Sequence, residues 1–84
     1  MNAETVPAQV KPVSNSLRFA RFLSDLKRRR NKGGLSQNEV AETMGVSYQS
    51  VNRWENSSFT NATVSNLLAY LNVLEANNIS TRID

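Results

Sequence analysis

Apolar side chains recur at helical spacing in four stretches of the chain. The first stripe has the i, i+3, i+4, i+7 pattern of a buried helix face, and it consists of Phe19, Phe22, Leu23 and Leu26. It predicts a helix over residues 17–31, with Ser16 as its N-cap and Gly33 and Gly34 at its end. Arg30 falls on the same stripe, and it needs a partner because an unpaired charge near a core is costly.

A second, shorter helix is predicted over residues 36–43. Its start is marked by a capping box, in which the side chains of Ser36 and Glu39 satisfy free backbone donors. The apolar side chains of its inward face are Val40, Ala41 and Met44. Gly45 ends this helix, because glycine tolerates the backbone angles of a sharp turn.

A third helix is predicted over residues 47–56, with Ser47 as its cap and with Val46 in the preceding turn. Only Val51 and Trp54 point inward from it. A connection of about three residues between two helices that share one core forces a steep crossing. The polar side chains that then project outward are Tyr48, Gln49, Asn52 and Arg53. This arrangement is typical of a helix-turn-helix, whose second helix can enter a DNA major groove.

The last predicted helix covers residues 63–76 and follows a loop, NSSFTNA. Its apolar side consists of Val64, Leu67, Leu68, Leu71 and Leu74, and Asn77 and Asn78 can end it. The alternating sequence of residues 79–84 indicates a tail or a short strand. Residues 1–15 contain two prolines and few large apolar side chains, which predicts a flexible arm. We therefore expect one compact, all-α domain of four to five helices over residues 16–78.

Composition excludes several classes of function. The chain has 84 residues, which suits one small domain, and it contains neither cysteine nor histidine. Disulfides, thiolate metal sites, a cysteine nucleophile and a Ser-His-Asp triad are therefore impossible. The acidic residues form no convergent pair, so we expect no enzyme, no catalytic residue, no metal and no other cofactor. No apolar run approaches the roughly 20 residues that span a bilayer, and the N-terminal sequence lacks the pattern of a secretory signal.

The net charge of +3 is unevenly distributed. Residues 16–35 hold one acidic side chain, Asp25, and seven basic ones, which are Arg18, Arg21, Lys27, Arg28, Arg29, Arg30 and Lys32. The rest of the chain holds three basic and six acidic residues. One end of the first predicted helix is thus strongly positive, which indicates either a solvated face or contact with a polyanion.

The outward side chains of the third predicted helix suit the recognition of bases. Glutamine can form two hydrogen bonds with adenine, arginine can do so with guanine O6 and N7, and tyrosine can touch a thymine methyl group or donate to a phosphate. Ser47 and Gln37 stand at helix starts, where backbone N–H groups and side chains can meet a phosphate. An ordinary polar surface is the alternative, but the joint spacing of the small, glycine and apolar positions favours DNA binding.

Residues 36–55, SQNEVAETMGVSYQSVNRWE, preceded by RRRNKGGL, resemble the phage repressor/Cro-type (XRE-like) helix-turn-helix DNA-binding domain. The resemblance extends from residue 17 to residue 74. It implies that the residues facing base edges are Tyr48, Gln49 and Arg53, and that those nearer to phosphates are Ser47, Ser50, Asn52 and Asn56. It also implies that Gln37 contacts the DNA backbone and braces the first residue of the recognition helix. Finally, it implies a buried salt bridge between Arg30 and Glu55, which supplies the partner that Arg30 needs.

The chain departs from the family pattern at two places. After WEN the family often has a basic loop, whereas this chain has Ser57, Ser58 and Phe59. The basic end of the first helix, with Lys27, Arg28, Arg29 and Lys32, is expected to compensate in part or to be solvated, and Arg28 and Lys32 are the residues expected to contact the DNA backbone. Phe59 is expected to pack locally or to contact a partner. The family's fifth helix is absent or reduced to residues 78–84, so the pattern does not identify the surface that joins two subunits.

We therefore expect a sequence-specific transcriptional regulator, a repressor that binds a palindromic operator on double-stranded DNA as a homodimer and blocks RNA polymerase. One alternative is the antitoxin of a toxin–antitoxin module, which represses its own promoter while residues 1–15 bind the toxin. Another is the controller protein of a restriction–modification operon. Contact of Glu42 with RNA polymerase would make the protein an activator. Such a regulator is expected in the cytoplasm, on the bacterial nucleoid or encoded by a phage or mobile element, and without membrane contact.

Overall fold

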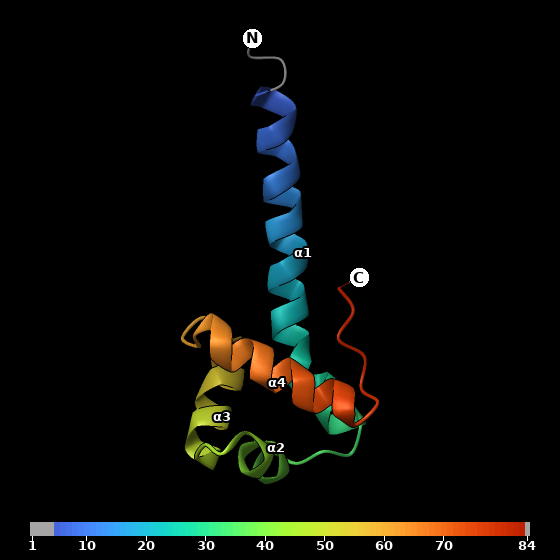
Figure 1. Cartoon of the computed structure of the whole chain (residues 1–84). Helices are drawn as coiled ribbons and strands as arrows, with labels where there is room; N and C mark the ends of the chain where they lie inside the picture. Colours follow the sequence, from blue (N-terminus) through green and yellow to red (C-terminus); the bar gives the residue numbers. More distant parts are fainter. Residues whose placement is uncertain (1–4, 84) are drawn as a thin grey trace.

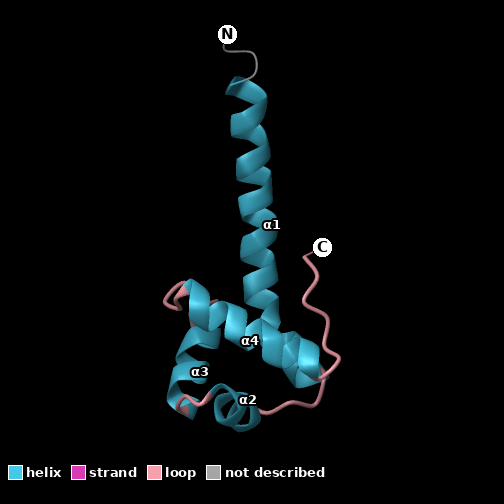
Figure 2. Cartoon of the chain, viewed as in Figure 1, coloured by secondary structure: helices cyan, strands magenta, loops and turns pink. Residues whose placement is uncertain are grey.

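The computed structural model describes residues 5–83, and it describes side-chain surroundings from residue 16 onward. These residues form four helices, which are α1 (Thr5–Lys32), α2 (Gln37–Met44), α3 (Tyr48–Asn56) and α4 (Val64–Ala76). No strand occurs in the described part of the chain (Figure 2). The predicted all-α fold with a helix-turn-helix is confirmed.

α1 is longer than the sequence pattern predicted. It begins at Thr5, within the predicted arm, so Ser16 lies inside the helix and does not cap it. Pro7 fits this start, because residues of the first turn donate no helical hydrogen bond. An existing helix also extends without a new nucleation step, so a stretch with a weak local signal can still be helical. Residues 1–4 lie outside the described residues, and the division into arm, domain and tail stays a prediction.

The N-terminal part of α1 projects away from the other three helices (Figure 1), and the chain measures 52 × 22 × 18 Å along its principal axes.

Among the described residues, no helix combines the length and the apolar character that crossing a membrane would require.

The starts and ends of α2, α3 and α4 agree with the predicted ones to within one residue, because local capping signals set them. The capping box of α2 is present: the hydroxyl of Ser36 accepts from the Glu39 N–H at 3.0 Å, and the Glu39 carboxylate accepts from the Ser36 N–H at 2.8 Å. Gly45 follows α2 with a φ of 73°, in the left-handed region that glycine adopts readily. The polypeptide can therefore turn sharply into α3.

One hydrophobic core joins the four helices, and its fully buried side chains are Leu26, Val40, Val51, Tyr70 and Leu74. Three residues predicted to be buried are exposed instead, namely Phe19, Val64 and Leu68. The ring of Phe19 stacks on that of Phe22, with 6.1 Å between the centroids, but its other side is open to solvent. Almost every side of α4 is apolar, so its sequence pattern does not select one face. Packing against α2 selects the face with Tyr70, Val73 and Leu74.

The segment after α4 packs on the end of α1. Ile79 is buried beside Gly33, so closely that an added Cβ on Gly33 would lie 2.5 Å from Ile79 Cδ1. Nη1 of Arg29 donates to the carbonyl oxygen of Ser80 at 3.0 Å, and the hydroxyl of Thr81 donates to the Glu75 carboxylate. Over residues 79–83 the chain is therefore a docked tail and not a strand.

Candidate nucleic-acid interface

α2 and α3 form a helix-turn-helix whose inner side is closed by core residues. Val40, Ala41 and Val51 are buried where the two helices meet. The turn is fixed by its own backbone, since the N–H of Val46 donates to the Ala41 carbonyl oxygen at 3.0 Å. The opposite side of α3 is therefore held outward as a rigid surface.

The three residues for which we predict base contacts all lie on that outward side. Tyr48, Gln49 and Arg53 are exposed, whereas Trp54 and Glu55 of the same helix are buried. Gln49 and Arg53 are four residues apart, so their side chains share one helix face. Within the described residues, none of the three makes a hydrogen bond or an ion pair through its side chain. Their polar groups are thus available to a ligand.

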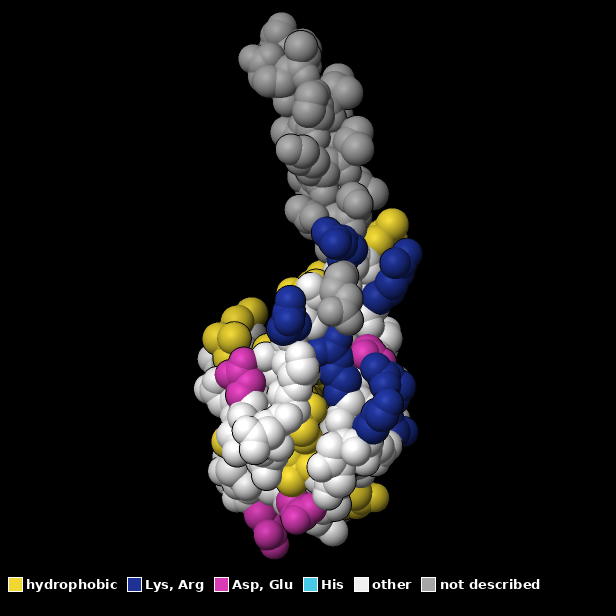
Figure 3. Space-filling model, turned by 90° about the vertical axis from the view of Figure 1, so that its right-hand side faces the viewer, with side chains coloured by type: hydrophobic (Ala, Val, Ile, Leu, Met, Phe, Trp, Pro, Cys, Tyr) yellow, Lys and Arg dark blue, Asp and Glu magenta, His cyan; other side chains and the backbone are white. Residues whose placement is uncertain are grey.

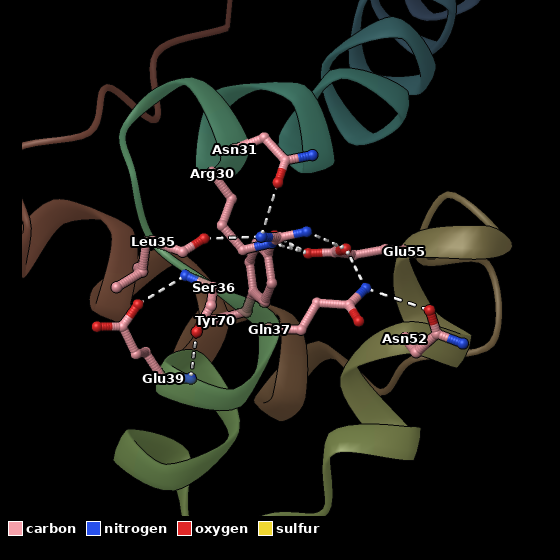
Figure 4. A network of polar contacts seen from close by, with 9 residues as sticks. All are labelled: Arg30, Asn31, Leu35, Ser36, Gln37, Glu39, Asn52, Glu55 and Tyr70. Carbon is pink, nitrogen blue, oxygen red and sulfur yellow. Dashed lines mark hydrogen bonds and ion pairs between the residues drawn. The ribbon is translucent and has the colours of Figure 1, made fainter.

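A polar network behind α3 fixes its position (Figure 4). The carboxylate of Glu55 accepts from Nε and Nη2 of Arg30 at 2.6 and 2.9 Å, and this is the pair that the resemblance implied. It also accepts from the Tyr70 hydroxyl at 2.6 Å and from Nε2 of Gln37 at 2.8 Å. Glu55 thereby connects α3 to each of the other three helices.

The electrostatics of this network keep Glu55 and Arg30 charged. Burial disfavours the carboxylate, but hydrogen bonds from Arg30, Tyr70 and Gln37 outweigh it and lower the pKa of Glu55. Burial likewise disfavours the guanidinium, but its bonds with Glu55 and the charge of that carboxylate raise the pKa of Arg30. Burial, together with the bond to Glu55, raises the pKa of Tyr70, so its hydroxyl remains a donor.

Gln37 has a different partner from the one that the resemblance implied. Its Nε2 donates to Oδ1 of Asn52 at 3.2 Å and to Glu55, not to Tyr48, the first residue of α3. The amide of Gln37 therefore uses both of its hydrogens inside the protein. Its backbone N–H, in the first turn of α2, is the group that remains for the predicted phosphate contact.

The other residues expected near phosphates lie along α3. Ser47 caps this helix, because its hydroxyl accepts from the Ser50 N–H at 3.2 Å, and the two hydroxyl oxygens are 3.0 Å apart. Asn52 is half-buried beside Gln37, and Asn56 is exposed at the end of α3. The structure thus places all four on the helix-turn-helix, and their phosphate contacts stay predictions.

The basic run of α1 is divided between two faces of the helix. Arg28 donates to Asp25 with Nε and Nη2, and Arg29 donates to the same carboxylate at 2.9 Å. These bonds, chiefly those from Arg28, lower the pKa of Asp25 to about 2. Lys32 and Arg28 line a hollow of about 250 Å³ against the C-terminal segment. No residue of α3 lines this hollow, so it does not bring Arg28 and Lys32 together with the recognition helix. Figure 3 shows a cluster of Lys and Arg side chains on the face that it views.

Sequence reasoning missed Tyr70, which both fills the core and holds Glu55. Its ring meets Phe59 edge to face, with 4.7 Å between the ring centroids. A signal was present, since Tyr70 is three residues after Leu67 and four before Leu74, the spacing of one helix face. Phe59 is buried, so of its two expected roles the structure shows local packing.

Comparison with known proteins agrees with this geometry. A helix-turn-helix family model matches residues 26–77, which is more than half of the chain. The match begins at Leu26 in α1 and extends past the end of α4, and so includes the whole surface described above. No curated protein and no solved structure matches the chain.

Proposed function

The chain belongs to the helix-turn-helix family and is a DNA-binding transcriptional regulator, and we propose that it acts as a repressor on a palindromic operator, which it binds as a dimer. The observation that carries the proposal is the outward face of α3. Tyr48, Gln49 and Arg53 are exposed, and within the described residues their side chains make no hydrogen bond or ion pair, while α3 itself is fixed through Glu55. Such a surface can form hydrogen bonds with the donors and acceptors of base edges in a DNA major groove.

The functional groups of the three side chains indicate which base each of them contacts. Arg53 donates to O6 and N7 of a guanine, and Gln49 forms two hydrogen bonds with an adenine. Tyr48 contacts a thymine methyl group or donates to a phosphate. The first-turn N–H of Gln37 and the side chains at residues 47, 50, 52 and 56 hold the backbone on either side of the groove.

The dimer follows from the small size of this surface. Three base-reading side chains specify too few base pairs to select one site, so two subunits are needed on one operator. The recognition helices of a two-fold symmetric dimer would enter successive major grooves about 34 Å apart, and this symmetry makes the operator palindromic. A dimer seated across a promoter excludes RNA polymerase, and this is the simplest route to repression.

The first experiment is a binding titration of the protein on duplex from its own upstream region, with a scrambled duplex of equal composition as the control, over a series of salt concentrations. We expect a preference of about a thousandfold or more for the upstream duplex, with two subunits bound per site. Equal binding to both duplexes, falling steeply with salt, would show that only phosphates are contacted, and it would contradict the proposed repressor.

Arg53→Ala tests the base contact within the same assay. We expect it to relax the preference at one base pair of each half-site, at a cost of about 1–3 kcal/mol. Arg82→Ala is the matched control, because it removes the same charge from the C-terminal segment. If Arg53→Ala weakened binding to every duplex by one factor, Arg53 would be a phosphate ligand and its assigned role would be wrong.

A further inference from the structure

Two neighbouring hollows follow one side of α1. The first, of about 330 Å³, is lined by Arg18, Arg21, Phe22, Asp25 and Arg29. The second, of about 250 Å³, is lined by Arg28, Arg29, Lys32 and residues 33 and 78–80. Arg29 belongs to both hollows, so together they form one surface, which we call the basic face. We propose that the basic face is a docking surface for an acidic segment of another protein.

The basic face concentrates the positive charge of the molecule. Its charged side chains are Arg18, Arg21, Asp25, Arg28, Arg29 and Lys32. Five of these are basic and one is acidic, so the face has a net charge of +4, whereas the whole chain has +3. Within the described residues, the side chains of Arg18, Arg21 and Lys32 make no hydrogen bond and no ion pair. Such a concentration of charge attracts a ligand of opposite sign.

The basic face is turned away from the recognition helix. Of the described residues, none from α2 or α3 lines either hollow. Lys27 lies on the other side of α1, where it lines a cleft together with Tyr48 and Asn52 of α3. The duplex that α3 enters is therefore on the opposite side of α1, and the basic face is open to a second ligand.

The arrangement of charge on the basic face favours a polypeptide over a second duplex. Asp25 lies in the middle of the face, since it lines the first hollow and accepts hydrogen bonds from Arg28 and Arg29 of the second. A DNA backbone carries a charge at every nucleotide, so one of its phosphates would approach this carboxylate. A polypeptide can place a carboxylate in each hollow, where arginine pairs with it strongly, and an uncharged residue opposite Asp25.

The floors of the hollows also suit a polypeptide. Phe22 lines the first hollow and Ile79 the second, and both are buried members of the core. The apolar parts of a protein segment can cover such side chains, whereas a phosphate gains nothing from them. A segment in which acidic and apolar residues are interspersed therefore matches the basic face.

A partner on the basic face does not compete with DNA. The two ligands lie on opposite sides of a helix that is about 10 Å across with its side chains. This exceeds the distance of about 8 Å over which charges are screened at physiological salt, so the two binding events should be nearly independent. The protein can thus hold an acidic partner while it occupies its operator.

The test is a fluorescence titration of the full chain with a labelled peptide that contains two pairs of glutamates separated by uncharged residues. The control peptide has glutamine in place of each glutamate, and we expect only the glutamate peptide to bind. Arg21→Gln should weaken this binding about threefold and the double variant Arg18→Gln, Arg21→Gln about tenfold, as expected for exposed ion pairs. Lys27→Gln is the matched control, because it removes the same charge from the other side of α1, and it should leave peptide binding unchanged.

A second titration, with the upstream duplex at saturation, should give the same peptide affinity. Failure of the glutamate peptide to bind, or its displacement by the duplex, would overturn the proposal. Equal weakening by Arg21→Gln and Lys27→Gln would also overturn it, since the peptide would then respond only to net charge. If the double variant reduced the salt slope of duplex binding by about 1.8, the value for two lost phosphate contacts, the basic face would be a DNA surface instead. The first titration contains no DNA, so its result is independent of the proposed repressor.

Discussion

Glu55 is the residue on which the arrangement of the four helices depends. Its two oxygens accept four hydrogen bonds from three side chains, and its side chain has no exposed surface. No buried side-chain polar atom of the described residues lacks a partner. Because a buried carboxylate is costly when a donor is removed, each of its partners can be tested by a substitution that keeps the shape of the core.

Tyr70→Phe removes one donor and keeps the packing against Phe59. We expect the free energy of unfolding to fall by about 1.5–3 kcal/mol, the range for a hydrogen bond to a charged group. Urea denaturation at neutral pH measures it. Tyr48→Phe is the control, since its hydroxyl is exposed, and it should change stability by less than about 0.5 kcal/mol. Equal losses in the two variants would show that the Tyr70–Glu55 bond contributes nothing particular.

The lowered pKa of Glu55 predicts how stability depends on pH. A carboxyl group with a lower pKa in the folded state stabilises the protein above its unfolded pKa, and this contribution is lost as pH falls through the folded pKa. Urea denaturation should therefore show stability declining as pH falls below the ordinary value of 4.5. Asp25, with a pKa of about 2, adds to the decline below 3.8, and Asp25→Asn removes that part. A carboxyl NMR titration that placed the Glu55 pKa above 4.5 would contradict the assignment.

At the scale of elements, local signals and long-range contacts determine different boundaries. Ser36, Ser47 and Thr63 each cap a helix through a hydroxyl that accepts a nearby N–H. These caps involve residues a few positions apart, so the sequence pattern located Ser36 and Ser47 as caps, and it placed Thr63 at the start of the last helix. The Gly33-Gly34 pair likewise marked the end of α1, but the position of the C-terminal segment depends on the contact between Gly33 and Ile79, which are distant in the sequence.

Gly33 and Gly45 are constrained in different ways, and a double-mutant cycle distinguishes them. Gly33 is limited by its contact with Ile79, whereas Gly45 is limited by its own backbone angle. Gly33→Ala should destabilise the protein because its Cβ would collide with Ile79, and Ile79→Ala should remove most of that penalty by making room. Gly45→Ala should cost about 1–2 kcal/mol from its φ of 73° alone, and Ile79→Ala should not rescue it. Urea denaturation of the single and double variants measures both couplings. Additive losses for Gly33→Ala and Ile79→Ala would show that the two do not interact.

At the scale of the molecule, one compact unit carries both the core and the recognition surface, while α1 extends beyond it (Figure 1). The buried core residues run from Phe22 to Ile79. Among the residues whose side-chain surroundings are described, the core therefore begins in α1 only at Phe22.

Deletion of residues 1–15 tests this division. We expect the shortened protein to unfold with a free energy close to that of the full chain, because Ser16 can then cap α1 and no described core side chain is lost. Calorimetry and the duplex titration measure stability and binding. If the deletion changed the number of subunits bound per operator, residues 1–15 would belong to the contact between subunits and would not be a separate arm.

The sequence by itself determined the helix-turn-helix, because capping, glycine turns and apolar spacing act between residues that are near one another in the chain. It also indicated the outward set at Tyr48, Gln49 and Arg53, since residues without an inward role in a short helix must face solvent. The Arg30–Glu55 pair came from the resemblance, and the structure contains that pair.

Only the tertiary structure decided features that depend on the crossing of helices distant in sequence. It selected Tyr70 over Leu68 as a core residue, because α4 is apolar on nearly all sides and packing chose the face. It directed Gln37 to Asn52, and it divided the basic run of α1, placing Lys27 beside the recognition helix and Arg28 beside the C-terminal segment. The sequence of a basic run does not show which neighbour each side chain faces, because that depends on how the helix packs against the rest of the protein. This packing rests on long-range contacts that no local pattern contains.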